Sequence, residues 1–185
     1  MHRKELQILV DNWEIMKEEM KQLTNFHHDV MRPFTGAWGD LPIDIFDSIV
    51  DADGWSGVEN SEKKWWNFPL FIYDGPTENA LKMTPKTVDI IRRVGGVHFC
   101  GFSLLLGKAI IPPHFDSPAC IDNPIGEITY HLGLICPEET CFLIHGKKAT
   151  LEADGKLISF NCTKTHSAVN MSDNVRVVLY LTFKN

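Results

Sequence analysis

Apolar residues recur at helical spacing near the start of the chain. Between residues 3 and 23 they alternate at steps of three and four, with Lys and Glu on the opposite face: Leu6, Leu9, Trp13, Met16, Met20 and Leu23. The pattern predicts a helix whose apolar stripe packs on the core of its own domain. A dimerising coiled coil is the alternative, although it needs about three or four heptads. A second, short helix is expected to open at Asp40-Leu41-Pro42, because proline is tolerated in a first turn.

The middle of the chain predicts one strand followed by one helix. Residues 51–67 are polar and glycine-rich and then rich in tryptophan, and Phe68–Tyr73 has the apolar character of a strand. Thr84 and Pro85 then suit the N-cap and the first position of a helix. That helix is expected to run to Val94 and to end at the glycine pair that follows.

From residue 97 onward the pattern changes to short runs of β-branched and aromatic residues. Six strands are expected at close spacing, with turn signals between them: Phe99–Leu106, Ala109–Pro112, Ile128–Ile135, Cys141–Ile144, Lys156–Phe160 and Val175–Phe183. This succession is typical of a mainly β, antiparallel double-sheet fold of the jelly-roll, cupin-like kind, supported by the N-terminal helices. A plain β-sandwich gives the same pattern, so periodicity leaves the topology open.

Length and composition favour one globular domain. The 185 residues are 44% hydrophobic and 23% charged, which suits a single core and excludes collagen-like, low-complexity and disordered classes. We expect residues 1–64 to form a helical and loop segment that packs on a β core at residues 65–185. A net charge of -6 without a basic run argues against nucleic acid as a partner.

The chain is expected to be cytoplasmic and to span no membrane. No window approaches about 18 consecutive apolar residues, and the N-terminus leads into an amphipathic stretch rather than the apolar core of a signal peptide. The five cysteines form no C-x-x-C pair, which suits reduced and mostly buried thiols. One bridge stays open, between Cys136 and Cys141.

His114 and Asp116 form a candidate metal site. Residues two apart on a strand point to the same face, so this imidazole and this carboxylate could grip one ion. A second histidine would complete a 2-His-1-carboxylate triad, which leaves coordination positions open on non-haem iron. A His-x-Asp pair by itself more often has a surface or capping role.

His166 and Arg176 are candidates for the second histidine ligand and for an anion-binding arginine. His166 follows the predicted strand that ends at Phe160, and Arg176 comes ten positions later inside the apolar run Val175–Leu179. A buried arginine is costly unless it pairs with an anion, although an arginine at a sheet edge can keep its head in water. Beside an iron site, we interpret Arg176 as a fork for the distal carboxylate of a dicarboxylate, 2-oxoglutarate.

Other polar and aromatic residues of the predicted strands have structural explanations by themselves. His131 stands in a strand of buried character, where a hydrogen-bonded core histidine is the usual role, and Ser103 is most simply a small core hydroxyl. Trp55, Trp65 and Trp66 could line the mouth of a substrate site, with core packing expected for at least one of them.

With these residues in view, the chain resembles the aspartyl/asparaginyl β-hydroxylase family of Fe(II)/2-oxoglutarate-dependent dioxygenases. The resemblance covers roughly Trp65 to Phe183 and rests on the order of its motifs and on the histidine-to-arginine spacing: Thr77–Ala80, Thr84–Thr87, the strand with Ser103, Pro113-His114, His131–Leu134, His166 and Arg176. It implies a double-stranded β-helix with His114 and His166 as iron ligands. It also implies that Arg176, Ser103 and His131 bind 2-oxoglutarate.

Three features of this sequence differ from the family pattern. The animal enzymes have glycine at the position of Asp116 and hold iron with two histidines, so Asp116 would restore a carboxylate ligand. Thr129 stands where the family has an arginine, which removes one of two arginines expected around cosubstrate and substrate. The stretch between His114 and His131 is longer than in those relatives, and its residues 117–128 suit a lid or a specificity loop.

Together these observations predict an oxygenase that uses Fe(II), 2-oxoglutarate and O2, with ascorbate as a helpful reductant. Iron would sit on His114, Asp116 and His166. The substrate that the resemblance implies is the β-carbon of an Asp or Asn residue in a peptide or protein. A free amino acid or an acyl chain is the alternative substrate, and a catalytically inactive metal- or ligand-binding module is the alternative from another class.

Overall fold

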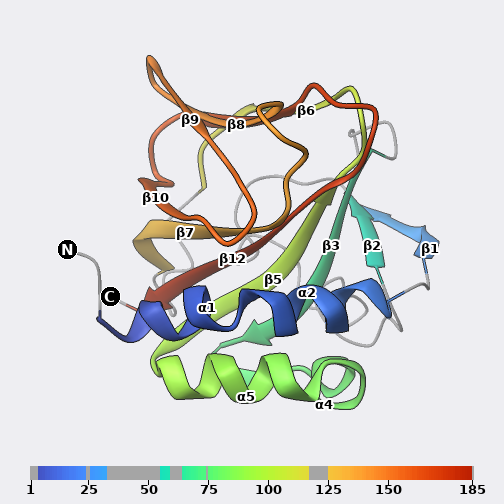
Figure 1. Cartoon of the computed structure of the whole chain (residues 1–185), viewed down its shortest axis with the longest axis vertical. Coiled ribbons are helices and arrows are strands. Elements are labelled where there is room, and N and C mark those ends of the chain that lie inside the picture. Colours follow the sequence, from blue (N-terminus) through green and yellow to red (C-terminus); the bar gives the residue numbers. More distant parts are fainter. Residues whose placement is uncertain are drawn as a thin grey trace.

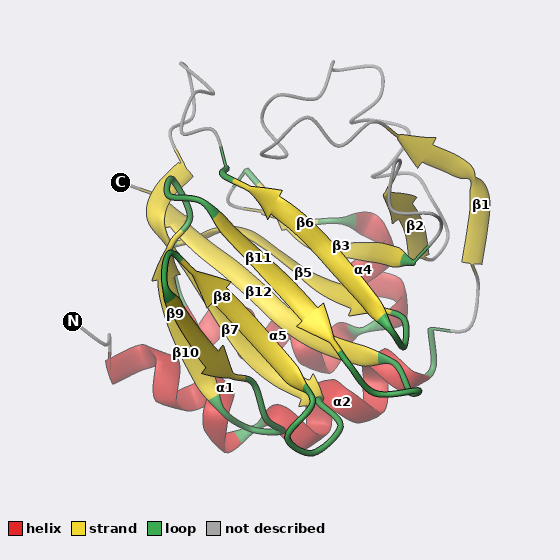
Figure 2. Ribbon diagram, turned by 90° about the horizontal axis from the view of Figure 1, so that it is seen from above, coloured by secondary structure: helices red, strands yellow, loops and turns green. Residues whose placement is uncertain are grey.

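The computed structural model describes residues 4–23, 26–32, 55–58, 64–73, 75–116 and 125–184. In this part of the chain, helices, a large sheet and a small sheet form three layers (Figure 1). The helices cover one face of the large sheet, and the small sheet lies over its other face (Figure 2). Within the described ranges, no helix combines the length and the apolar character needed to cross a membrane.

Among the described residues, the large sheet contains eight strands. Seven follow one another in the order β1 (Phe26–Arg32), β2 (Trp55–Val58), β3 (Trp65–Ile72), β5 (Val97–Leu105), β12 (Arg176–Lys184), β7 (Ile125–Ile135) and β10 (Leu157–Asn161). The eighth, β4 (Gly75–Pro76), pairs with β3. Neighbours are antiparallel except for the parallel pair β1–β2.

The small sheet has four antiparallel strands in the part of the chain that the structure describes. They follow in the order β6 (Ala109–His114), β11 (His166–Asn170), β8 (Cys141–His145) and β9 (Lys148–Leu151). Along the chain, successive strands pass from one sheet to the other, from β5 to β6, then to β7 and to β8. Two antiparallel sheets wound in this way form a jelly-roll. The predicted mainly β, double-stranded β-helix fold is therefore confirmed.

All six strands predicted from residue 97 onward are present, with ends shifted by a few residues. The pattern did not predict β1, β2, β4, β9 or β11. In β11 the sequence His-Ser-Ala-Val-Asn is short and polar, so it carries too little apolar signal. The short helix expected at Asp40 lies outside the described residues.

Alternation along β12 separates two interiors. Val177, Leu179 and Leu181 belong to the core between the sheet and the helices, whereas Arg176 and Tyr180 line the cavity between the two sheets. Because both faces of this strand are covered, its sequence is apolar almost throughout. Arg176 is consequently conspicuous in the sequence.

The N-terminal stripe packs on the core of its own chain, as predicted. It runs through a short 3-10 turn, Lys4–Leu6, and two helices, α1 (Gln7–Asp11) and α2 (Trp13–Lys21), and its Leu and Met side chains are buried with those of the large sheet. One continuous helix was expected, but the chain breaks at Asn12. The side-chain amide of Asn12 donates to the main-chain carbonyl of Ile8 at 2.7 Å. Such a local bond from a side chain to the main chain competes with helical geometry.

Two further helices of the described residues, α4 (Glu78–Met83) and α5 (Pro85–Val94), follow β4. Thr84 is the N-cap of α5 and Pro85 is its first residue, as predicted, but the Thr84 hydroxyl donates to the carbonyl of Ala80 instead of capping. The cap comes from α2, where the carboxylate of Glu19 accepts from the main-chain N–H groups of Lys86 and Thr87. A carboxylate suits this position because it satisfies unpaired N–H groups at the positive end of a helix.

The loop after β9 crosses β7 at Gly133. The N–H of Gly155 donates to the carbonyl of Gly133 at 2.9 Å, and the N–H of Gly133 donates to the carbonyl of Lys156 at 3.0 Å. A Cβ atom at Gly133 would collide with the carbonyl of Ala153. Glycine at this position therefore lets the loop lie against the sheet, and the same loop carries Glu152 into the interior.

We expect Gly133→Ala to lower the free energy of unfolding by about 2 kcal/mol or more, because the added methyl must displace the main chain of Ala153. Gly75→Ala is the matched control, since the nearest atom to its Cβ would be 4.0 Å away. Denaturant titration of both variants measures the difference. Equal stabilities would mean that the loop can move away from β7 without cost.

Candidate metal centre and its cavity

His114, Asp116 and His166 meet at one end of the small sheet. β6 ends at His114 and β11 begins at His166, and these two residues are register partners in the antiparallel pair. One ligand atom from each of the three residues lies within 4.8 Å of the others. The predicted metal-binding residues, which are 52 positions apart at their extremes, are therefore close enough to share an ion.

Asp116 reaches this point in a different way from that expected. The sequence predicted that His114 and Asp116 share one face of a strand, but β6 ends at His114, so Asp116 follows the strand. The N–H of Asp116 donates to the carbonyl of Cys162 at 2.8 Å, and this bond holds the main chain in place. Oδ1 of Asp116 lies 3.9 Å from Nε2 of His114.

Main-chain carbonyls fix the tautomers of both histidines. Nδ1 of His114 lies 2.7 Å from the carbonyl oxygen of Pro112, and Nδ1 of His166 lies 3.0 Å from that of Lys164. A carbonyl only accepts, so Nδ1 carries the proton and donates in both rings. The lone pair of each neutral ring is then on Nε2, as a metal ligand requires.

The donor set fits a divalent transition metal. Two imidazole nitrogens and one carboxylate oxygen form the set typical of non-haem iron. Burial lowers the pKa of His166 to about 4, and the neighbouring His114 and His131 act in the same direction, although the hydrogen bond to the Lys164 carbonyl opposes them. His166 is consequently neutral near pH 7 and needs no deprotonation to bind a metal.

The cavity beside these ligands lies between the two sheets. Its walls are largely apolar and include side chains from both sheets: Trp65, Phe99, Ile111, Leu143, Phe160 and Ala168. The other predicted site residues, Ser103, His131 and Arg176, line the same cavity. All six residues singled out in the sequence thus lie around one space, and so does Thr129.

Arg176 is fully buried and paired within the chain. Its Nε donates to Oε2 of Glu152 at 2.9 Å, and its Nη2 donates to Oε1 at 2.6 Å. His131 completes the cluster through Nδ1, which lies 2.9 Å from Oε1 of Glu152. Burial raises the pKa of Glu152, but Arg176 and His131 outweigh this effect and bring it to about 2. Glu152 is therefore ionised, and the positive charge of Arg176 is already compensated.

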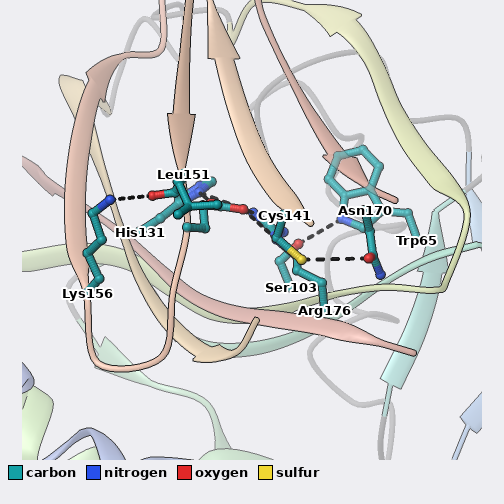
Figure 3. Close-up of polar contacts among 9 residues, drawn as sticks. Trp65, Ser103, His131, Cys141, Leu151, Lys156, Asn170 and Arg176 are labelled. Atoms are coloured by element: carbon teal, nitrogen blue, oxygen red, sulfur yellow. Dashed lines mark hydrogen bonds and ion pairs between the residues drawn. The ribbon is translucent and has the colours of Figure 1, made fainter. Parts of the chain in front are cut away.

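Ser103 is held by a tryptophan. Nε1 of Trp65 donates to the Ser103 hydroxyl oxygen at 2.9 Å, a bond drawn in Figure 3 together with Arg176 and His131. Trp65 also lies against the metal site, since its ring centroid is 6.0 Å from that of His114. Of the three tryptophans weighed in the sequence, Trp55 and Trp66 belong to the core on the helix side, and Trp65 lines the cavity.

Some buried polar atoms of the cavity have no hydrogen-bond partner among the described residues. They are Oδ1 of Asn67, Oγ1 of Thr182 and Nη1 of Arg176. Thr182 is the register partner of Thr129, whose hydroxyl interacts with the thiol of Cys162. Because an unsatisfied buried polar group is costly, such atoms are candidate contacts for a ligand.

Sequence reasoning missed Glu152 and Asn67. Glu152 stands in Leu151-Glu152-Ala153, and a charge between two apolar residues was its one signal. Cys136 and Cys141, between which a bridge was left open, are both free thiols here. They lie close together beside Val178, and the thiol of Cys141 donates to Oδ1 of Asn170 at 3.6 Å (Figure 3).

The chain is similar to several known proteins. A family model described as Aspartyl/Asparaginyl beta-hydroxylase matches residues 10–185. The ornithine lipid ester-linked acyl 2-hydroxylase of Rhizobium tropici is 26% identical over 127 residues, which cover 67% of this chain and 43% of that protein. The match therefore spans less than half the length of this curated relative.

Two solved structures are similar in shape. A 2OG-Fe(II) oxygenase family oxidoreductase from Burkholderia pseudomallei has 15% identity and a TM-score of 0.45, with 87% of this chain and 95% of that chain covered. The Cupin_2 domain of an XRE family transcriptional regulator from Enterobacter cloacae has 12% identity and a TM-score of 0.43, with 65% and 96% covered. Neither likeness bears on the chemistry. The family model, in contrast, covers nearly the whole chain and confirms the resemblance noted from the sequence: the chain belongs to the aspartyl/asparaginyl β-hydroxylase family.

Proposed function

We propose that the chain is an Fe(II)- and 2-oxoglutarate-dependent oxygenase that hydroxylates an unactivated C–H bond. The observation that carries this proposal is the convergence of His114, Asp116 and His166 within 4.8 Å. The Nδ1 proton of both histidines is directed to a main-chain carbonyl, and a buried arginine lines the same cavity. Membership of a hydroxylase family supports it.

The three ligands would hold iron on one side and leave the other positions open. When bound, the metal supplies the oxidation that side chains cannot perform: R–H, O2 and 2-oxoglutarate give R–OH, succinate and CO2. The protein's own contribution is to fix the ligand geometry and to exclude water. The apolar walls around Phe160 and Leu143 suit the second task.

Arg176 and Ser103 are the groups that we assign to the distal carboxylate of 2-oxoglutarate. Arg176 lines the cavity, and its buried Nη1 has no hydrogen-bond partner among the described residues. The Ser103 hydroxyl can donate its proton while it accepts from Trp65. His131 has a more restricted role. Nδ1 of His131 donates to Glu152, so Nε2 is unprotonated when the ring is neutral. Nε2 can therefore donate to a carboxylate of the ligand only when the ring carries both protons.

An acyl chain is the substrate class that the cavity favours. Among the described lining residues, Arg176 is the one Lys or Arg side chain, and Glu152 already compensates its charge. Thr129 offers a hydroxyl instead of a cation for a substrate carboxylate. The largely apolar walls suit a hydrocarbon, and the Rhizobium tropici relative is named as an acyl hydroxylase. An Asp or Asn residue, which the family description names, is the second candidate.

Asp116→Ala is expected to weaken Fe(II) binding by at least about tenfold, because loss of a ligand should cost no less than loss of a group that only supports one. Asp173→Ala is the matched control, since Asp173 is exposed and does not line the cavity. Anaerobic titration with Fe(II) compares the two variants. Equal affinities would remove Asp116 from the ligand set and leave a two-histidine site.

Incubation with Fe(II), ascorbate and 2-oxoglutarate is expected to give succinate, and the true substrate should stimulate it and gain about 16 Da, one oxygen atom. An ester-linked acyl lipid and an Asp- or Asn-containing peptide are the substrates to compare by mass spectrometry. His166→Ala is the negative control. If iron binds but neither substrate yields succinate or a mass gain, the chain is better described as a metal-binding module.

A further inference from the structure

Glu152 accepts hydrogen bonds from Arg176, the arginine that the family resemblance assigns to the cosubstrate. Its two carboxylate oxygens take the Nε and Nη2 side of Arg176, at 2.9, 2.6 and 2.7 Å. Both side chains are almost completely inaccessible, with 0% of Arg176 and 1% of Glu152 exposed. An Arg–carboxylate pair with two parallel hydrogen bonds is among the stronger polar contacts in proteins.

Main-chain contacts hold Glu152 in this position. Its N–H donates to the carbonyl of Cys141 at 2.9 Å, and the loop that follows lies against Gly133 of β7. The carboxylate is thus attached to a fixed loop rather than to a long mobile segment. It is delivered from the edge of the small sheet to an arginine on the large sheet.

One nitrogen of Arg176 is left for a ligand. Nη1 has no partner among the described residues, and Arg176 lines the cavity. A second carboxylate that binds there would share the guanidinium with Glu152 and would lie near another negative charge. The cluster of Arg176, Glu152 and a neutral His131 carries no net charge, so adding an anion makes it negative.

We propose that Glu152 is an internal competitor for the anion site on Arg176, and that it lowers the affinity of the cavity for the distal carboxylate of a dicarboxylate. The name of that ligand, 2-oxoglutarate, rests on the proposed function, whereas the competition rests on the contacts of Arg176. Glu152 would thereby set how tightly the cavity binds a carboxylate. While the cavity holds no anion, Glu152 compensates the guanidinium of Arg176. Without Glu152, that guanidinium would be an uncompensated buried charge.

Glutarate is the probe that tests this inference, because it has the two carboxylates but no keto group to chelate iron. Its affinity is measured without metal, by calorimetry and by the rise in melting temperature. We expect Glu152→Gln to bind glutarate at least about tenfold more tightly than the unmodified chain, since the substitution keeps the shape and removes the competing charge at close range. Glu138→Gln, at an exposed glutamate, is the matched control and should bind as the unmodified chain does.

Two further variants guard against a failure to fold. Glu152→Asp keeps the charge but draws it back from Arg176, and it should also bind glutarate more tightly. Glu152→Gln combined with Arg176→Gln removes both buried charges, and its melting temperature should no longer respond to glutarate. If Glu152→Gln, or Glu152→Asp where the former does not fold, binds glutarate no more tightly than the unmodified chain, Glu152 is only a structural partner of Arg176.

The outcome is separable from that of the proposed function. Tighter glutarate binding without succinate formation in the iron assay would support the competition and contradict the oxygenase proposal. Succinate formation with unchanged glutarate affinity would support the oxygenase proposal and contradict the competition.

Discussion

The register of one short strand pair holds the candidate metal centre together. β6 and β11 are aligned so that His114 faces His166, and the side-chain period of a strand is two residues. A slip of one residue would turn one imidazole to the opposite face of the small sheet. The hydrogen bond from Asp116 to the carbonyl of Cys162 then brings the carboxylate to the same point. The placement of the two imidazoles therefore follows from sheet pairing, whereas that of Asp116 depends on this contact beyond the end of β6.

A buried cluster of charged and polar side chains, Arg176, Glu152 and His131, lies beside the cavity. Its formation depends on a close main-chain contact. Gly133 allows the loop after β9 to reach the sheet, the loop carries Glu152, and Glu152 holds Arg176 and His131. Buried ion pairs contribute little net stability, but removal of one partner is costly. Folding and anion binding are thus coupled at Arg176, because any group that replaces Glu152 must also compensate the guanidinium.

The sequence predicted most strands of the β core, together with His114, Asp116, His166 and Arg176, because those features leave local signals, whereas Ser103 and His131 were assigned through the family resemblance. His114 and Asp116 are two positions apart, and Arg176 interrupts an apolar run. Glu152 left almost no signal, since its partner is 24 residues away on the other sheet. The cap of α5 was assigned to Thr84 for a similar reason, because Glu19 comes from a distant helix. Propensity describes neighbours in sequence, whereas these contacts exist only after the layers have packed.

The support of the two imidazoles has an evolutionary consequence. The proton on each ring is directed by a peptide carbonyl, of Pro112 and of Lys164, and not by a carboxylate or amide side chain. Every amino acid supplies that same oxygen. The side chains at positions 112 and 164 can therefore vary among relatives, provided that the main chain keeps its conformation. An alignment would show these positions as variable, although their carbonyl groups orient the metal ligands.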